Sequence, residues 1–441
     1  MFEEYIDQKM MVEKLQECIS IRSIKSEAEA GKPYGRNVFR ALEYTLKLAA
    51  ELGFRTANID GHAGYAEYGE GEEMIAVLCH LDVVPEGDGW TYPPFEGRVV
   101  DGTIYGRGTT DDKGPLIASL FSLKAIMDSG IKLKRRIRII FGTDEESGSH
   151  DMIRYKETEE LPVMAFTPDA DYPVIFSEKS LVNLRLTKKL DGGSSCWTLV
   201  TAKGGNVVNQ VPDSGQMILQ RDGEQIKLTG KGAAAHGSAP QAGKNAIDDL
   251  IRQFQEHPCF AESAAELRAF ADFYMDHLYD SPDGSGFDAA CCDGELGRST
   301  FNTGLLYGDR EKIQLTLDCR FPASMDTEDV LQRITATCEK ASFQAEITKN
   351  KQGLYMAKDH PLVTTLQKIY EEETCEECEP IAIGGGTYAK TLPNTVAFGP
   401  IFPGCQNRIH EADEFITIDE LMKDVQIFIK ALCALAGEGD Q

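Results

Sequence analysis

Short runs of apolar residues along the chain alternate with longer stretches in which apolar residues recur every three or four positions. The runs are MIAVLC at 74–79, IRIIF at 137–141, VMAF at 163–166 and TVAF at 395–398. Continuous apolar runs of this length are typical of strands in a parallel sheet that is covered on both faces. We therefore predict a central sheet that contains these four segments.

Three stretches have the apolar spacing of helices, and each stops at a glycine. The first covers residues 36–53 and stops at Gly53, the second runs from Pro115 to Gly130, and the last stops at Gly437. Glycine is favoured just after a helix because it adopts the left-handed conformation without strain. Strand, helix and strand in this order predict an α/β fold in which a mostly parallel sheet is flanked by helices.

The pattern changes near residue 180, where apolar and polar residues alternate in WTLVTAK and KIQLTLDCRF, with one helical stretch near 245–278. Alternation predicts strands of an antiparallel sheet with one covered face. The chain has 441 residues, and single cores usually stop growing at about 250 to 300 residues. We expect one domain of residues 1–178 and 355–441, and an inserted α+β domain of residues 179–354.

The charge balance excludes several classes of partner. Lys and Arg number 45 against 71 Asp and Glu, so the net charge is −26, and such a chain repels nucleic acid and anionic lipid. The first residues lack a basic and apolar leader, and no apolar run approaches the ~18 residues of a membrane span. We expect a cytoplasmic protein with no nucleic-acid or membrane partner. The twelve cysteines suit reduced thiols, and the lone pair Cys375 and Cys378 does not complete a zinc site.

Histidine and carboxylates follow the predicted strands. Such residues come after each of the first three runs and in the turn before the helix at 115–130. They are His80, Asp82, Asp111, Asp112, Asp144, Glu145, Glu146, Asp169 and Asp171. The adjacent acids at 144–146 have two interpretations, a solvated loop or helix start, or a site for a multivalent cation that removes their repulsion. Ligands bind where parallel strands end, and histidine with carboxylates suits zinc or manganese.

The segments HLDVVP, YGRGTTDDKGP, TDEESGS, TPDAD and RIHEADE resemble, in order and spacing, the signatures of a co-catalytic metallopeptidase family. That family includes carboxypeptidase G, aminoacylase, desuccinylase and carnosinase. The resemblance covers nearly the whole chain, including GKGAAAHGSAPQAGKNAI, and is strongest to the bacterial dipeptidase V-like, manganese-dependent branch. It implies that the sheet domain is catalytic and that the inserted domain is a lid.

The resemblance implies two divalent ions per chain, zinc or manganese, with cobalt also compatible. His80, Asp111 and Asp169 would bind one ion, and Asp111, Glu146 and His410 the other. Asp82 would hydrogen-bond the His80 ring. Glu145 would be the general base that activates a hydroxide shared by the ions, and the peptide between Asp111 and Asp112 would be cis.

The same resemblance assigns the substrate contacts. His236 would help to bind the oxyanion, and the remaining contacts would hold the carboxylate end of the substrate: Asn209, Arg320, Gly385 and Gly386. Arginine suits this task because its planar fork meets a carboxylate with two hydrogen bonds.

Three functions remain open from the sequence. The first is hydrolysis of dipeptides or very short peptides with a free amino terminus, because family peptidases of that kind tend to have Asp at the position of Asp169. The second is an N-acyl-amino-acid deacylase of the same family, and the third a non-catalytic metal- or peptide-binding relative. The enlarged insertion, as in the dipeptidase branch, implies a monomer.

Overall fold

The computed structural model describes residues 2–191 and 196–437, which group into two compact units. Of these, the first unit contains residues 2–176, 356–381 and 387–437, and the second contains residues 177–191, 196–355 and 382–386. The second unit thus includes a short segment, 382–386, that the sequence pattern assigns to the sheet domain.

The main sheet of the first unit has the strand order β1-β2-β6-β3-β7-β21-β9. The four predicted strands are confirmed as its neighbouring central strands β6, β3, β7 and β21, which pair in parallel, whereas the outer pairs are antiparallel. The bounds are β1 Arg55–Ile59, β2 Ala63–Tyr68, β3 Met74–His80, β6 Arg136–Gly142, β7 Met164–Thr167, β9 Ile175–Glu178 and β21 Thr395–Ala397.

Both faces of strand β3 are covered, which explains why its apolar run is unbroken. All seven residues of β3 are buried. Cys79 faces Ser119 of helix α3 on one side, and Leu78 belongs to a buried cluster with Met152 and Tyr388. The helices of this unit are α1 Gln8–Ile19, α2 Arg36–Glu51, α3 Lys113–Ser129, α4 His150–Thr158, α8 Pro361–Thr374 and α9 Ile418–Ala436.

The three predicted helices are confirmed as α2, α3 and α9. Each is followed within two residues by the expected glycine with a positive φ, 100° at Gly53, 72° at Gly130 and 69° at Gly437. Other residues rarely adopt this conformation, so the glycines fix where the helices stop.

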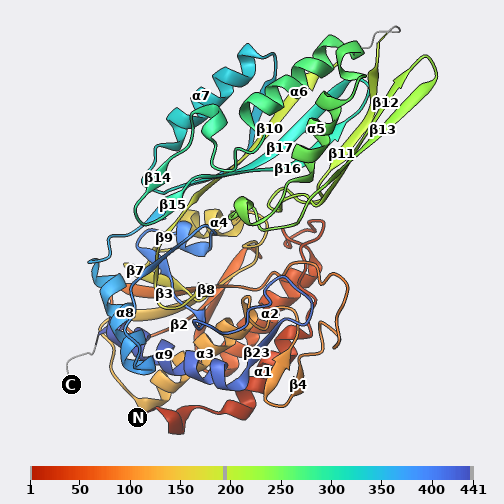
Figure 1. Ribbon diagram of the computed structural model, residues 1–441. Helices are drawn as coiled ribbons and strands as arrows, with labels where there is room; N and C mark the ends of the chain where they lie inside the picture. The colour runs from red at the N-terminus through yellow and green to blue at the C-terminus, as the bar shows by residue number, and fades with distance from the viewer. Residues whose placement is uncertain (1, 192–195, 438–441) are drawn as a thin grey trace. The chain divides into compact units, whose positions relative to one another are not determined.

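The second unit is built on an antiparallel sheet with the order β13-β12-β11-β16-β17-β10-β18, drawn from yellow-green to cyan in Figure 1. Its bounds are β10 Ser180–Lys189, β11 Thr198–Gly204, β12 Ser214–Arg221, β13 Glu224–Lys231, β16 Thr300–Gly308, β17 Lys312–Phe321 and β18 Gln344–Lys351. Helices α5 (Ala246–Glu256), α6 (Ala265–His277) and α7 (Thr327–Lys340) lie against one face of this sheet (Figure 1).

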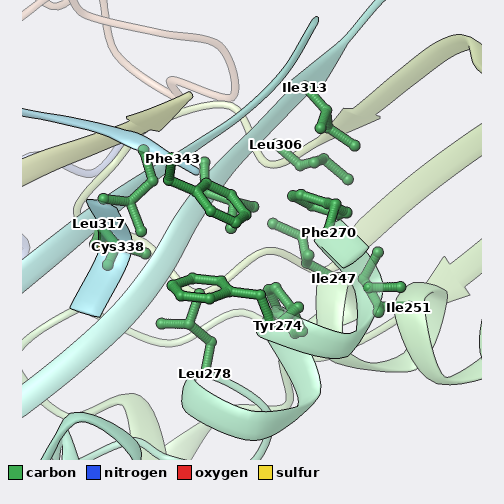
Figure 2. Close-up of a cluster of buried hydrophobic side chains, with 14 of the residues drawn as sticks. Ile247, Ile251, Phe270, Tyr274, Leu278, Leu306, Ile313, Leu317, Cys338 and Phe343 are labelled. Carbon is green, nitrogen blue, oxygen red and sulfur yellow. The ribbon is translucent and has the colours of Figure 1, made fainter. Parts of the chain in front are cut away.

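The core of the second unit lies between these helices and the sheet. Figure 2 shows Ile247 and Ile251 from α5 together with Phe270 and Tyr274 from α6, and Leu306 of β16 lies among them. In each pair the two residues are four positions apart, so they project from one face of their helix.

The single helical stretch predicted near 245–278 is wrong in one respect, because it is two helices, α5 and α6. Pro258 lies between them. Proline lacks an amide hydrogen and disfavours a helical conformation of the preceding residue, so the helix ends before it.

Short elements complete the two units: η1 Glu3–Tyr5, β4 Arg98–Val100, β5 Thr103–Tyr105, β8 Ala170–Asp171, η2 Pro240–Ala242, η3 Phe260–Glu262, η4 Ser285–Phe287, β14 Cys292–Asp293, β15 Gly297–Arg298, β19 Leu354–Tyr355, β20 Ile381–Ile383, η5 Tyr388–Lys390, β22 Pro400–Ile401 and β23 Phe415–Thr417. Among residues 2–191 and 196–437, no helix has the length and apolar character needed to cross a membrane.

Candidate active site

The carboxyl ends of the parallel strands bring the predicted ligands of the first unit together. His80 is the last residue of β3 and pairs in register with Gly142, the last residue of β6. Glu146 lies in the turn after β6, and Asp169 follows β7. Asp111 comes from the turn before α3, so separate segments meet at one edge of the sheet.

Two groups of side chains at this edge can each hold a metal ion. The first is His80, Asp111 and Asp169, and the second is Asp111, Glu146 and His410; within each group the ligand atoms lie within 4.8 Å of one another. These are the two sets that the family resemblance implies. The peptide between Asp111 and Asp112 is cis, as expected from the resemblance.

Asp111 belongs to both groups and directs one oxygen toward each histidine. Its Oδ1 lies 2.8 Å from His80 Nε2, and its Oδ2 lies 3.0 Å from His410 Nε2. His410 Nε2 is also 3.2 Å from Glu146 Oε1. A carboxylate in this position can bridge two cations.

The electrostatics of the cluster favour added positive charge. Burial and, after it, the neighbouring charge of Asp111 together raise the pKa of Asp169 to about 7. Burial and Asp111 likewise raise the pKa of Glu146. Although desolvation opposes protonation of His410, its contacts with Asp111 and Glu146 raise its pKa to about 11. The carboxylates thus draw protons onto the histidines, and a metal ion takes the place of such protons when it binds.

Two buried atoms of the cluster fit metal ligands better than hydrogen-bonding groups. His80 Nε2 and Asp111 Oδ1 lie 2.8 Å apart, yet neither makes a hydrogen bond to any part of the chain that the structure describes. Buried polar groups in native proteins almost always have a partner. A cation that contacts both atoms would satisfy them, so the residues present fit a metal site.

Asp82 contacts the His80 ring through its main chain. His80 Nδ1 lies 3.0 Å from the carbonyl oxygen of Asp82 and 3.6 Å from the nearer carboxylate oxygen. The carboxylate instead accepts the backbone N–H groups of Glu145 at 3.1 Å and Glu146 at 3.2 Å. Asp82 therefore orients the ring with its carbonyl group and the acidic turn with its side chain.

The three adjacent acids at 144–146 have different surroundings. Asp144 is buried and accepts hydrogen bonds from Lys25 Nζ at 2.5 Å and Ser147 Oγ at 2.7 Å. Glu146 belongs to the second metal group. Glu145 lies between them and is partly exposed. Their mutual repulsion is reduced because Asp144 pairs with a cation and Glu146 faces a histidine.

Sequence reasoning missed Asp151 and Tyr388, which support the same turn. The buried carboxylate of Asp151 accepts the backbone N–H groups of Thr143 at 2.6 Å and Asp144 at 3.0 Å, and the hydroxyl of Tyr388. The Tyr388 ring meets the His80 ring edge-on, with centroids 6.1 Å apart. A Cβ at Gly142 would lie 2.1 Å from the Tyr388 hydroxyl oxygen, so the glycine there was the available signal.

The residues predicted to contact the substrate lie in the second unit. His236 is exposed, and its Nδ1 lies 2.6 Å from Ser238 Oγ. The carbonyl oxygen of Asn209 accepts the N–H of Gly237 at 2.7 Å, so Asn209 and His236 are neighbours. Gly385 and Gly386 belong to the segment 382–386 of the same unit.

Arg320 is already paired within its own unit. Its guanidinium donates to Asp318 at 3.3 Å through Nε and at 3.0 Å through Nη2, and to the carbonyl oxygen of Gly384 at 2.6 Å through Nη1. Asp318 and Arg320 are both buried. Asp318, which sequence reasoning did not single out, therefore fixes the orientation of Arg320 beside the glycine segment.

Comparison with known proteins places this architecture in a family. The model of the peptidase family M20/M25/M40 matches residues 76–434. A Bacillus subtilis protein named "Putative dipeptidase YtjP" is 34% identical, over 97% of both chains. Human carnosine dipeptidase 1 has a similar fold (TM-score 0.60, 15% identity, 97% of this chain and 96% of that one), and so does the Sulfolobus solfataricus metallo-carboxypeptidase Sso-CP2 (TM-score 0.62, 17% identity, 96% and 98%).

The two solved structures are too distant in sequence to indicate more than a shared fold, and by name they act on peptides in different ways. The family match spans residues 76–434, a range that contains all five residues of the two metal groups, and the relative of 34% identity matches over 97% of this chain. This chain therefore belongs to the peptidase family M20/M25/M40.

Proposed function

We propose that this peptidase hydrolyses dipeptides, or very short peptides, that have a free amino terminus, and that it does so with two divalent metal ions. The single observation that carries the proposal is the position of Asp111, whose two oxygens face His80 and His410, one from each metal group. The name of the Bacillus subtilis relative supports a dipeptide as the substrate.

Charge supports two ions in the cluster. Two divalent cations bring four positive charges against the three carboxylates Asp111, Glu146 and Asp169, which leaves about one positive charge. An ionised Glu145 brings the total near zero. Metal ions in such a site supply Lewis acidity, since they polarise a carbonyl oxygen and make water more acidic.

Glu145 is the proposed general base. The backbone N–H of Glu145 donates to the Asp82 carboxylate at 3.1 Å, and Asp151 fixes the two residues before it. The main chain of Glu145 is therefore held in one position beside the metal groups. It accepts the proton of the attacking water and returns it to the nitrogen of the leaving amino acid. A general base positioned in this way contributes about 100- to 10,000-fold to a rate.

The second unit is the proposed lid. His236 would donate to the oxyanion, and Asn209, Arg320, Gly385 and Gly386 would receive the carboxylate end of the peptide. The pairing of Arg320 with Asp318 and Gly384 supports this role, because it keeps the guanidinium in one orientation. The resemblance also supports a free amino terminus, because family members that act there tend to have Asp at the position of Asp169, where deacylases tend to have the longer Glu.

The test compares Ala-containing dipeptides with the same compounds N-acetylated, using full-length protein that has been stripped with a chelator and given back Zn²⁺, Mn²⁺ or Co²⁺ singly. We expect hydrolysis of the free dipeptides and little of the acetylated forms, and anomalous scattering should locate two ions at Asp111. Preference for the acetylated forms would identify a deacylase instead. Failure to cleave either with any metal would refute the proposal.

A further inference from the structure

The buried carboxylate of Glu414 is enclosed by the turn that carries Asp111. Its Oε1 accepts the backbone N–H groups of Gly108 at 3.0 Å, Thr110 at 3.0 Å and Asp111 at 3.2 Å. None of the residue roles that the resemblance implies falls on Glu414. Three main-chain donors on one carboxylate oxygen hold the turn in a single conformation, since hydrogen bonds to an ionised group are stronger than neutral ones.

The other oxygen of Glu414 is neutralised by a buried arginine. Glu414 Oε2 accepts from Arg107 Nη1 at 2.5 Å. The guanidinium of Arg107 lies over the ring of Trp90, 5.3 Å from its centroid, and only 1% of Arg107 is exposed. The charge of Glu414 is thus compensated without any contribution from the metal groups.

The main chain around Glu414 is tied to the same turn. The N–H of Gly106 donates to the carbonyl oxygen of Glu414 at 2.9 Å, and the hydroxyl of Thr110 donates to the carbonyl oxygen of Phe415 at 2.7 Å. Glu414 also lies only four residues after His410. One carboxylate therefore joins the segment of His410 to the turn of the ligand shared by both metal groups.

We propose that Glu414 is a positioning residue for the metal pair: it fixes the main chain of Asp111 so that the two carboxylate oxygens face His80 and His410. This inference rests on the proposed two-metal function. Groups that orient metal ligands typically contribute 10- to 100-fold to metal affinity. Because Asp111 is shared, loss of this support weakens the binding of both ions.

The test uses Co²⁺ as the probe on full-length protein stripped of metal. The variant Glu414→Gln keeps one oxygen acceptor but places an amide N–H₂ where the oxygen facing Arg107 was. We expect both Co²⁺ dissociation constants, measured by calorimetry, to rise about 10- to 100-fold, and the visible absorption of the bound Co²⁺ to change.

The matched control is Asp413→Asn, in the neighbouring residue. Asp413 accepts the backbone N–H and the hydroxyl of Thr91, both at 2.7 Å, so it performs the same kind of anchoring on a segment without metal ligands. Asp413 has a φ of 57°, which asparagine tolerates. This control should bind Co²⁺ as the wild type does.

Thermal unfolding of the metal-free proteins separates positioning from general stability, because a merely structural role lowers the midpoint but leaves Co²⁺ affinity and absorption of the folded protein unchanged. If Glu414→Gln does not fold, Glu414→Asp decides. It keeps the negative charge but draws the carboxylate back by one methylene from the N–H groups of Thr110 and Asp111, and we expect a loss of affinity in the same direction.

The outcomes separate this inference from the proposed function. Wild-type protein that binds two Co²⁺ ions, together with a folded variant that binds them equally well, would overturn the role of Glu414 alone. If the variant binds only one of the two Co²⁺ ions more weakly, Glu414 does not act through Asp111, which both metal groups share. Wild-type protein that does not bind two ions would overturn the two-metal function, and this inference with it.

Discussion

The carboxylate of Asp82 accepts the backbone N–H of Glu145 at 3.1 Å. Asp82 lies just after strand β3, and Glu145 lies in the turn after β6, so the bond joins the ends of two parallel strands. The same Asp82 holds the His80 ring through its carbonyl oxygen. The proposed base and a proposed metal ligand therefore take their positions from one residue.

The first prediction concerns Glu145. Replacement by Gln removes the proton acceptor but not its backbone bond to Asp82, so turnover should fall about 100- to 10,000-fold while two metal ions still bind. Steady-state kinetics and metal analysis of the same preparation check this. The control Glu157→Gln, on the exposed face of α4 beside Arg154, should behave as wild type. Normal turnover of the Glu145 variant would exclude it as the base.

The second prediction concerns metal removal. Without cations the carboxylates of the two groups repel one another, so chelation should loosen the turns that carry them. Hydrogen exchange should become faster at residues 106–112 and 142–149 and slow again when Mn²⁺ or Zn²⁺ is added. Helices α5 and α6 of the second unit provide the internal reference. Equal acceleration there would indicate general unfolding instead.

The third prediction is a pH dependence in the second unit. Burial raises the pKa of Asp248 to about 6, although Tyr274 donates a hydrogen bond to it at 2.6 Å. A carboxyl whose folded pKa is raised favours folding below its ordinary pKa, and that contribution is lost as pH rises through about 6. Asp248→Asn keeps an oxygen acceptor and cannot ionise. Relative to wild type, its thermal midpoint should therefore rise between pH 4 and pH 8, by an amount equivalent to at most about 3 kcal/mol.

The neighbouring Asp249 serves as a control because its pKa is shifted in the opposite direction. Burial opposes its ionisation, but hydrogen bonds from the N–H of Lys231 and from Arg252 and Gln253 outweigh this and lower its pKa. Its ionised form therefore favours folding, and this contribution is lost as pH falls. Asp249→Asn should lose stability relative to wild type at pH 8 and recover toward acid pH. If both variants respond to pH in the same direction, the interpretation of Asp248 is wrong.

The fourth prediction concerns the proposed lid. We propose a monomer in which His236 serves the metal site of its own chain, as the enlarged insertion and the resemblance to the dipeptidase branch imply. The variants Glu145→Gln and His236→Ala should each be inactive, and a mixture of the two should stay inactive. Substantial recovery of activity on mixing would show that the histidine comes from a partner chain. Sedimentation of the wild type supplies the oligomeric state independently.

Local pattern was enough to locate most of the sheet and the ligand-bearing segments. The unbroken run at 74–79 is typical of a strand covered on both faces, and β3 is such a strand. Glycines at 53, 130 and 437 stop helices because of their own backbone freedom. That His80, Glu146 and Asp169 lie close together could be predicted, because each follows a parallel strand and the carboxyl ends of such strands meet at one edge of the sheet.

Tertiary structure decided which atoms meet. The turn that carries Asp111 is held by Glu414, 303 residues away, and Tyr388 reaches Asp151 across 237 residues. Within the second unit, the segment around Gly384 joins Arg320 across 64 residues. Such partners are set by the packing of distant segments, where buried donors and acceptors must be satisfied. The sequence by itself determined the elements and the chemistry available at their ends, whereas the contacts that orient this chemistry depend on chain packing, which no local periodicity records.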